Sequence, residues 1–186
     1  MKTIKIKISG KEKNINLLND FLFGKLLGER GCEKEALHLI NVFTKRNFKS
    51  LSYEPNEIKS ERTGNKKAIT DVLVMMNDGS IINIEAQRAK QKKFHKRSHF
   101  YNSRIYSILL RAGKNYEELP MTFMINIIDF NLHKLEKYHT TFTLCEKTHK
   151  EYEIADIMEI HYIDLTKFRK SRFSNIAKSK ILQSSE

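Results

Sequence analysis

The chain has 186 residues, of which 40% are hydrophobic and 30% are charged, and its formal net charge is +12. This length fits one domain with a core, and the scarcity of glycine and proline excludes a collagenous or low-complexity chain. The longest apolar runs are about a quarter of the roughly 20 residues that a membrane helix needs, so we expect no membrane partner. No secretory pattern is present near the N-terminus, and Cys32 and Cys145 match no metal spacing. These features together favour a reduced, cytoplasmic protein.

The positive charge is concentrated in two segments. Between Glu85 and Glu117 there are nine basic residues and no acidic one, and six more basic residues lie between Thr166 and Ser185. The rest of the chain carries 19 basic residues against 22 acidic ones. A concentrated basic patch is typical of a surface that binds a phosphate backbone, although a solubilising face is an equal alternative for a charge run taken alone.

Hydrophobic periodicity and turn residues predict the elements in chain order. We expect residues 1–14 to form a strand or an ordered arm and 56–67 to form a polar loop. Helices are predicted over 20–27, 33–45 and 94–112, and strands over 51–54, 69–76, 80–87, 121–129, 138–145 and 157–165. This order predicts an α/β fold with a mixed β-sheet flanked by helices. One domain is expected over residues 15–170, followed by a polar, basic tail over 171–186.

The hairpin between the second and third predicted strands has a defined register. The sequence Asn77-Asp78-Gly79 predicts a three-residue loop whose glycine takes the left-handed position. Counting along the ladder then places Asp71 directly opposite Glu85, with Gln87 on the same face. A two-residue loop would instead place Asp71 opposite Ala86 and separate the two carboxylates.

This register brings two acidic side chains together. Opposed carboxylates repel unless a cation joins them or one of them is protonated. The neighbours of Asp71 and Glu85 in sequence are apolar, and carboxylates in such surroundings usually have partners. Hard oxygen ligands in a partly open site suit Mg²⁺. The alternative is that both residues are ordinary solvent-side charges at strand ends.

Asp71 followed by Glu85-Ala86-Gln87 resembles the D…(E/Q)-x-(K/Q) core of the PD-(D/E)XK nuclease superfamily. Six ordered segments also resemble the PD-(D/E)XK nuclease family transposases, which are described as recombination-promoting nucleases too. The segments are NDFLFGKLLG (19–28), KAITDVL (67–73), DGSIINIEAQ (78–87), YNSRIY (101–106), GKNY (113–116) and MEIHYIDL (158–165). Arg97 also resembles a residue of the family's helix after the hairpin. The similarity extends over roughly residues 15–170, and agreement of several ordered segments is more specific than three catalytic residues.

The resemblance implies a restriction-endonuclease-like core and DNA cleavage that depends on Mg²⁺, for which Mn²⁺ can substitute. It implies that Asp71, Glu85 and the Ala86 carbonyl bind the metal, that Gln87 orients the attacking water, and that Asp20 assists. Gln87 stands where lysine is usual in the superfamily, although glutamine is usual there in this subgroup, and it cannot supply the positive charge of a lysine. We expect a nearby lysine to supply it, and the candidates are Lys66, Lys67 and Lys90.

The helix predicted after the hairpin carries a basic stripe. Arg97, Arg104 and Arg111 recur every seven residues, which places them on one side of a helix, and Tyr101 lies one turn from Arg97. We expect this stripe to bind the DNA backbone. The other expected DNA-binding residues are Arg88, Lys92, Lys93 and Lys96. The alternative is that the arginines are solvated or pair with acids such as Glu117 and Glu118.

Weaker candidates have simpler interpretations. His95 and His99 have metal-like spacing but lack the glutamate of a zinc hydrolase motif, so we assign them to the basic face. Asp129 and Asp164 follow apolar strands and are interpreted as caps or turn residues. Besides a DNA endonuclease, the sequence leaves open an inactive DNA-binding remnant of such a nuclease and a basic adaptor for an acidic protein. It also leaves open a homodimer and a C-terminus shorter than that of the family.

Overall fold

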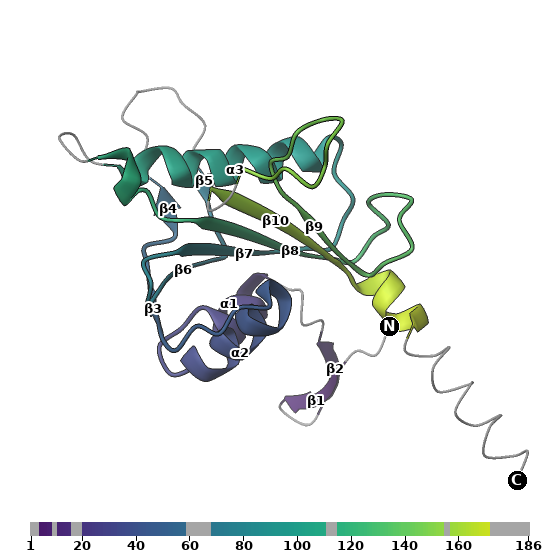
Figure 1. The fold of residues 1–186 in the computed structure, drawn as a ribbon. Coiled ribbons are helices and arrows are strands. Elements are labelled where there is room, and N and C mark those ends of the chain that lie inside the picture. The colour runs from purple at the N-terminus through teal and green to yellow at the C-terminus, as the bar shows by residue number, and fades with distance from the viewer. Residues whose placement is uncertain are drawn as a thin grey trace, which may run out of the picture.

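The computed structural model describes residues 4–8, 11–15, 20–58, 68–110, 115–154 and 157–171. At the centre is a six-stranded sheet with the strand order β3-β6-β7-β8-β10-β9 (Figure 1). Its strands are β3 (Leu51–Tyr53), β6 (Val72–Met76), β7 (Ile81–Gln87), β8 (Thr122–Ile128), β9 (His139–Phe142) and β10 (Met158–Asp164). The pairs β7–β8 and β8–β10 are parallel and the other pairs are antiparallel. The predicted mixed sheet is therefore confirmed.

Helices cover both faces of this sheet (Figure 1). On one face lie α1 (Asp20–Leu27) and α2 (Glu33–Thr44), and on the opposite face lies α3 (Phe94–Leu109). The largest apolar cluster joins α1 and α2 to the sheet, and it includes Ile40, Phe48 and Phe123. Two smaller clusters lie under α3, around Tyr101 and Phe94. The predicted α/β fold with flanking helices is thus confirmed, and both faces of β7 and β8 are buried.

The hairpin β6–β7 has the register that the sequence predicts. Met76 donates its amide hydrogen to the carbonyl of Ser80 at 2.8 Å, and Val72 pairs with Ile84. Gly79 has a φ of +87°, a left-handed conformation that glycine adopts without the steric cost of a side chain. Continuing this register by one residue places Asp71 opposite Glu85.

The strand predicted over 69–76 is interrupted. It consists of a short strand β5 (Ala68–Ile69) and of β6, with Thr70 and Asp71 between them. At the interruption Thr70 donates its amide hydrogen to the Asn56 carbonyl, and Asp71 donates its amide hydrogen to the Glu85 side chain. These bonds replace a regular ladder, which is why the strand breaks beside the acidic pair.

Other departures from the predicted elements concern their ends. The expected N-terminal strand is a hairpin of β1 (Ile4–Ile8) and β2 (Lys11–Ile15), and β4 (Glu57–Ile58) pairs with β5 inside the expected loop 56–67. Helix α3 ends at Leu109, before the predicted end at residue 112, and residues 111–114 lie outside the described residues. A one-turn 3-10 helix, η1 (Tyr116–Glu118), leads into β8. None of the described helices is long and apolar enough to cross a membrane.

Candidate functional site

The side chains of Asp71 and Glu85 each accept a hydrogen bond from a backbone amide on the opposite side of the hairpin. Glu85 Oε1 accepts one from the Asp71 amide at 3.2 Å, and Asp71 Oδ2 accepts one from the Ala86 amide at 2.8 Å. The side-chain amide of Asn83 also donates to Glu85 Oε1, at 3.3 Å. This reciprocal pattern holds both carboxylates at the junction of β6 and β7, where the register aligns them. Sequence reasoning did not single out Asn83, although its period-two spacing from Glu85 places it on the same face.

Glu85 is in an unfavourable environment for a negative charge. The residue is only 5% exposed. Burial, followed by the nearby charge of Asp71, raises the pKa of Glu85 to about 7, although the Arg97 guanidinium and the hydrogen bonds from Asn83 and Asp71 oppose this rise. A buried carboxyl beside a second one is a pair that would be stabilised by a bound cation.

A cationic side chain reaches this pair from α3. Arg97 Nη2 lies 3.6 Å from Glu85 Oε2. Its Nη1 donates to Gln87 Oε1 at 2.9 Å and to Gln91 Oε1 at 3.1 Å. The guanidinium also lies over the ring of Tyr101, 5.1 Å from the ring centroid. Among the sequence alternatives, the one in which Arg97 pairs with an acid is therefore observed, but the acid is Glu85 and not Glu117 or Glu118.

Three contacts of α3 fix the position of Arg97. Phe94 packs edge-on against Phe130, Ser98 donates its hydroxyl hydrogen to Asn126 Oδ1 of β8 at 3.0 Å, and Tyr101 lies in the core. These anchors lie on either side of Arg97 along the helix, so its side chain extends to the ends of β6 and β7. No local sequence motif announces this contact, since it depends on how α3 crosses the sheet.

An open cavity of about 310 Å³ lies beside the site. The residues that line it are Asp71, Ala86, Gln87, Arg88, Ala89, Gln91 and Arg97. The cavity thus has one carboxylate, two arginines and two amides in its wall, which is a polar surface suited to an anion next to a cation. Both ends of the Gln87 side-chain amide are hydrogen-bonded. Oε1 accepts from Arg97, and Nε2 donates to the Ala89 carbonyl at 3.1 Å.

The donor set fits a Mg²⁺ ion that keeps several waters. Within the described ranges, no group of three or more His, Cys, Asp or Glu side chains is placed to hold a metal. Mg²⁺ commonly uses only one or two protein carboxylates and takes its remaining ligands from waters and substrate phosphate. Asp71 and Glu85 can supply these two carboxylates, and burial together with the charge of Asp71 raises the pKa of Glu85 in spite of the nearby Arg97.

The remaining predicted site residues are distributed as follows. Arg88, Lys92, Lys93 and Lys96 are exposed around the start of α3, as a nucleic-acid contact requires. Tyr101 is only 8% exposed and packs beneath Arg97, so its ring offers little surface to DNA, and its role in DNA binding stays a prediction. Arg97 is turned toward Glu85 and Gln87, beside the acidic pair, and its contact with a phosphate backbone stays a prediction. Arg104 is half-buried, and Arg111 lies outside the described residues.

The residues expected to assist catalysis are only partly described. Asp20 is the first residue of α1, but its side chain lies outside the described part of the molecule. Lys66 and Lys67 also lie outside the described residues, and Lys90 is exposed and does not line the cavity. The described cation that contacts Gln87 is Arg97, which the sequence had assigned to DNA binding alone.

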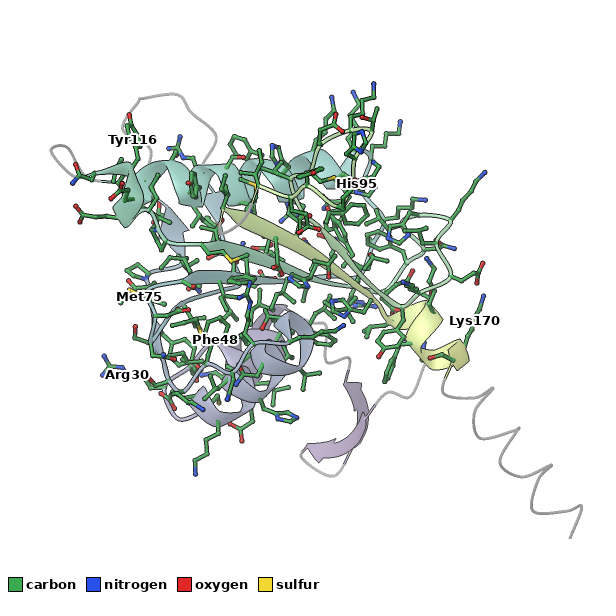
Figure 2. The ribbon with its side chains drawn as sticks, viewed as in Figure 1. Arg30, Phe48, Met75, His95, Tyr116 and Lys170 are labelled. Atoms are coloured by element: carbon green, nitrogen blue, oxygen red, sulfur yellow. The ribbon has the colours of Figure 1, made fainter. Side chains whose placement is uncertain are left out.

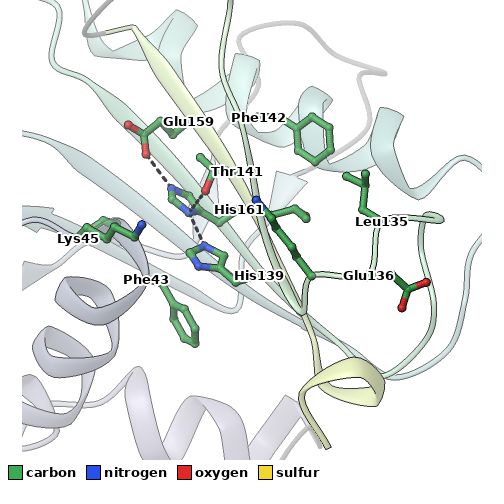
Figure 3. A pocket seen from close by; sticks show the side chains of 12 residues that line it. Phe43, Lys45, Leu135, Glu136, His139, Thr141, Phe142, Glu159 and His161 are labelled. Atoms are coloured by element: carbon green, nitrogen blue, oxygen red, sulfur yellow. Dashed lines mark hydrogen bonds and ion pairs between the residues drawn. The ribbon is translucent and has the colours of Figure 1, made fainter. Parts of the chain in front are cut away.

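A second cavity, of about 730 Å³, lies on the opposite face of the sheet between α2, β9 and β10 (Figure 3). There His161 is buried and bonds to Glu159 Oε2 through Nε2 at 2.9 Å and to His139 and Thr141 through Nδ1 at 3.0 and 3.2 Å. Burial, and then the charges of His161 and Lys45, lower the pKa of His139. These bonds join the edge strand β9 to β10, and they are separate from the acidic pair.

The weaker candidates have structural roles. His95 is exposed beside Lys96, and its ring packs edge-on against that of Tyr162 at a centroid distance of 5.5 Å. Asp164 caps the helical residues 165–171 by accepting from the amides of Thr166 and Lys167. Asp129 pairs with Arg169. The interpretation of Asp164 as a cap is therefore confirmed, whereas Asp129 forms an ion pair and no capping bond of its side chain is observed among the described residues.

An α/β protein with a mixed sheet and a paired aspartate and glutamate on a central hairpin has the architecture of a PD-(D/E)XK nuclease domain. The sequence profile of the PD-(D/E)XK nuclease family transposases matches residues 17–181, which is most of the chain. The chain therefore belongs to the PD-(D/E)XK nuclease family transposases. No curated protein and no solved structure matches it significantly.

Proposed function

We propose that this protein is a Mg²⁺-dependent endonuclease that hydrolyses phosphodiester bonds in DNA. The observation that carries the proposal is the acidic pair of Asp71 and Glu85, held face to face beside a cavity with arginines in its wall. Membership of a nuclease family supports the reaction class, and the exposed basic residues near α3 support DNA as the substrate.

The Asp71 and Glu85 carboxylates and the Ala86 carbonyl would hold the ion. When bound, a divalent ion activates a water molecule and stabilises charge on the phosphate, and Mn²⁺ can fill the same oxygen site. The Ala86 amide fixes the orientation of Asp71, and the amides of Asp71 and Asn83 fix that of Glu85. Both ligands are therefore positioned before the ion arrives, which reduces the ordering cost of binding.

The net reaction consumes one water molecule. Its oxygen bonds to phosphorus while the bond from phosphorus to the leaving sugar oxygen breaks. One proton of the water is released and the leaving oxygen gains a proton, so that a phosphomonoester and an alcohol result. Negative charge builds up on the non-bridging phosphate oxygens during this step, and the cationic wall of the cavity favours it.

Plasmid nicking tests this proposal. We expect the wild type to nick supercoiled DNA with Mg²⁺ and to lose this activity in EDTA. Asp71→Asn keeps an acceptor for the Ala86 amide but removes the charge, so it should abolish nicking and retain DNA binding. The matched control is Asp78→Asn, which makes the same change in the exposed turn at the other end of the hairpin and should nick as the wild type does.

Two results would contradict the proposal. Nicking that persists in purified Asp71→Asn would show that the acidic pair is not the catalytic site. A folded wild type that binds DNA but shows no nicking with Mg²⁺ or Mn²⁺ would favour the inactive DNA-binding remnant. Failure of the wild type to bind DNA would favour the adaptor for an acidic protein.

A further inference from the structure

The superfamily core has a lysine or a glutamine where this chain has Gln87, and a glutamine leaves open the source of the positive charge beside the phosphate. The described residues offer one cation in contact with Gln87, the guanidinium of Arg97. Its Nη1 is 2.9 Å from Gln87 Oε1, and its Nη2 is 3.6 Å from Glu85 Oε2. A single arginine therefore contacts both the neutral replacement and the acidic pair.

The position of Arg97 allows it to reach a bound phosphate. Its side chain is 35% exposed and lines the same cavity as Asp71 and Ala86. The buried ring of Tyr101 supports one side of the guanidinium at 5.1 Å from the ring centroid. An arginine offers five N–H donors in a planar fork, so it can keep one bond to Gln87 and direct other donors to phosphate oxygens.

Gln87 and Arg97 are chemically matched. The carbonyl oxygen of a glutamine side chain accepts a hydrogen bond from a guanidinium, whereas a lysine at position 87 would place an ammonium against it. The Gln87 amide is itself oriented by the Ala89 carbonyl, which accepts from Nε2 at 3.1 Å. The glutamine that stands in place of the lysine is thus the residue that holds Arg97 in place.

We propose that Arg97 is a catalytic residue, which supplies to the scissile phosphate the positive charge that the lysine supplies elsewhere in the superfamily, and that Gln87 is its positioning residue. The inference rests on the proposed nuclease function. Arg97 neither gives nor takes a proton, because its guanidinium stays charged. It stabilises the negative charge that develops on the non-bridging oxygens as the water oxygen bonds to phosphorus and the sugar oxygen leaves.

Moving the positive charge from position 97 to position 87 tests the assignment. The variants are Arg97→Gln, Gln87→Lys and the double variant Gln87→Lys/Arg97→Gln, in which the cation moves from α3 to β7. We expect Arg97→Gln to lower the nicking rate by about 10²–10³-fold, which is typical for the loss of one preorganised transition-state contact. The double variant should recover at least about ten-fold over Arg97→Gln, because an ammonium then occupies the vacated space beside Glu85.

Mg²⁺ binding by calorimetry supplies a readout apart from activity. Arg97→Gln should bind Mg²⁺ as tightly as the wild type or more tightly, because the guanidinium beside Glu85 repels the metal ion. The matched control is Arg30→Gln, which removes the same charge from an exposed position on the opposite side of the sheet from α3 (Figure 2). This control should match the wild type in nicking and in Mg²⁺ affinity.

The positioning role of Gln87 has its own test. Gln87→Met keeps the size of the side chain but removes the acceptor, so it should slow nicking in the wild type. It should have no further effect in Arg97→Gln, where there is no guanidinium to hold. Equal effects in both backgrounds would show that Gln87 acts independently of Arg97.

Three outcomes would overturn the inference while leaving the nuclease proposal standing. The first is an Arg97→Gln variant that nicks as fast as the wild type. The second is a double variant that is folded and binds Mg²⁺ but is no faster than Arg97→Gln. The third is weaker Mg²⁺ binding by Arg97→Gln, which would assign Arg97 to the structure of the metal site. An inactive wild type would instead refute the nuclease function itself.

Discussion

The negative charge of Glu85 is unfavourable in the folded protein even with Arg97 nearby, and a bound cation would offset this cost. Its carboxyl group is buried beside Asp71, and the folded protein raises its pKa to about 7. The unfolded chain loses this proton near the usual value of 4.5, so the folded state binds more protons between these two values. The contribution of Glu85 to stability is therefore present at low pH and is lost as the pH rises through about 7. Functional sites commonly keep such unfavourable groups because the chemistry requires them.

Glu85→Gln should stabilise the metal-free protein at alkaline pH. Glutamine keeps an acceptor for the Asp71 amide but carries no charge. The difference in melting temperature between the variant and the wild type, measured in EDTA, should be smallest near pH 5 and reach roughly 5 °C at pH 8. The same substitution at exposed Glu136 should give no such rise.

At pH 8, added Mg²⁺ should make the wild type melt at a higher temperature than Glu85→Gln. The ion should raise the melting temperature of the wild type and leave that of Glu85→Gln nearly unchanged, because the variant lacks one ligand. A pH-independent difference between the two proteins, or an equal response to Mg²⁺, would mean that Glu85 is not a buried metal ligand.

The acidic pair could be predicted from the sequence, whereas its cationic partner could not. The register of the hairpin depends on three consecutive residues, Asn77-Asp78-Gly79, and on the fixed alternation of a strand, so Asp71 and Glu85 follow by counting. The contact between Gln87 and Arg97 depends on where α3 crosses the sheet. That crossing is set by packing at Phe94, Ser98 and Tyr101, which no local pattern reveals.

At the scale of elements, strand ends were the least predictable feature. Strand β6 begins only at Val72 because side chains at Asp71 and Glu85 take backbone hydrogen bonds that a ladder would use. Sequence periodicity over 69–76 cannot reveal this substitution, since the apolar pattern continues through the break. The order of helices and strands was predictable because apolar periodicity and turn residues define each element locally.

Helix α1 ends in close contact with the sheet. A Cβ atom added at Gly28 would lie 2.9 Å from the Gly24 carbonyl oxygen and 3.1 Å from Val72 Cγ2, whereas one added at Gly24 would meet nothing within 4 Å. Both glycines lie in the segment that resembles the family opening, but only Gly28 is required by packing. The close approach places the end of α1 against β6, the strand that begins directly after Asp71.

Gly28→Ala should therefore destabilise the fold, and Gly24→Ala should not. Overpacking against backbone and a buried valine costs about 1–3 kcal/mol, whereas alanine within an open helical position gains up to about 1 kcal/mol over glycine. Thermal or urea unfolding of the two variants measures both effects. Equal stability of the two variants would show that α1 does not approach β6 as closely as the structure has it.

For the molecule as a whole, positive charge is concentrated in the segment after β7, where nine basic residues and no acidic residue lie between Glu85 and Glu117. Arg88 and Arg97 line the cavity beside the acidic pair, and the exposed lysines follow Arg88 in the sequence, so a DNA backbone held by Arg88 would pass close to Asp71. Phosphate contacts of this kind fix position without reading sequence. Tyr101 lies in the core beneath Arg97, so in the proposed function charged side chains would make most of the contacts to DNA.

The salt dependence of DNA binding measures how many phosphates these basic residues contact. Each phosphate contact that is lost should flatten the plot of log affinity against log salt by about 1. The triple variant Arg88→Gln/Lys92→Gln/Lys96→Gln should therefore reduce the magnitude of the slope by about 3 for duplex DNA in EDTA. The matched control, Arg30→Gln/Lys34→Gln/Lys49→Gln, removes the same charge from exposed positions outside this segment and should change the slope by less than about 1. If both triple variants flatten the slope equally, binding follows the net charge of the chain, and the basic residues around the start of α3 are not a defined DNA-binding surface.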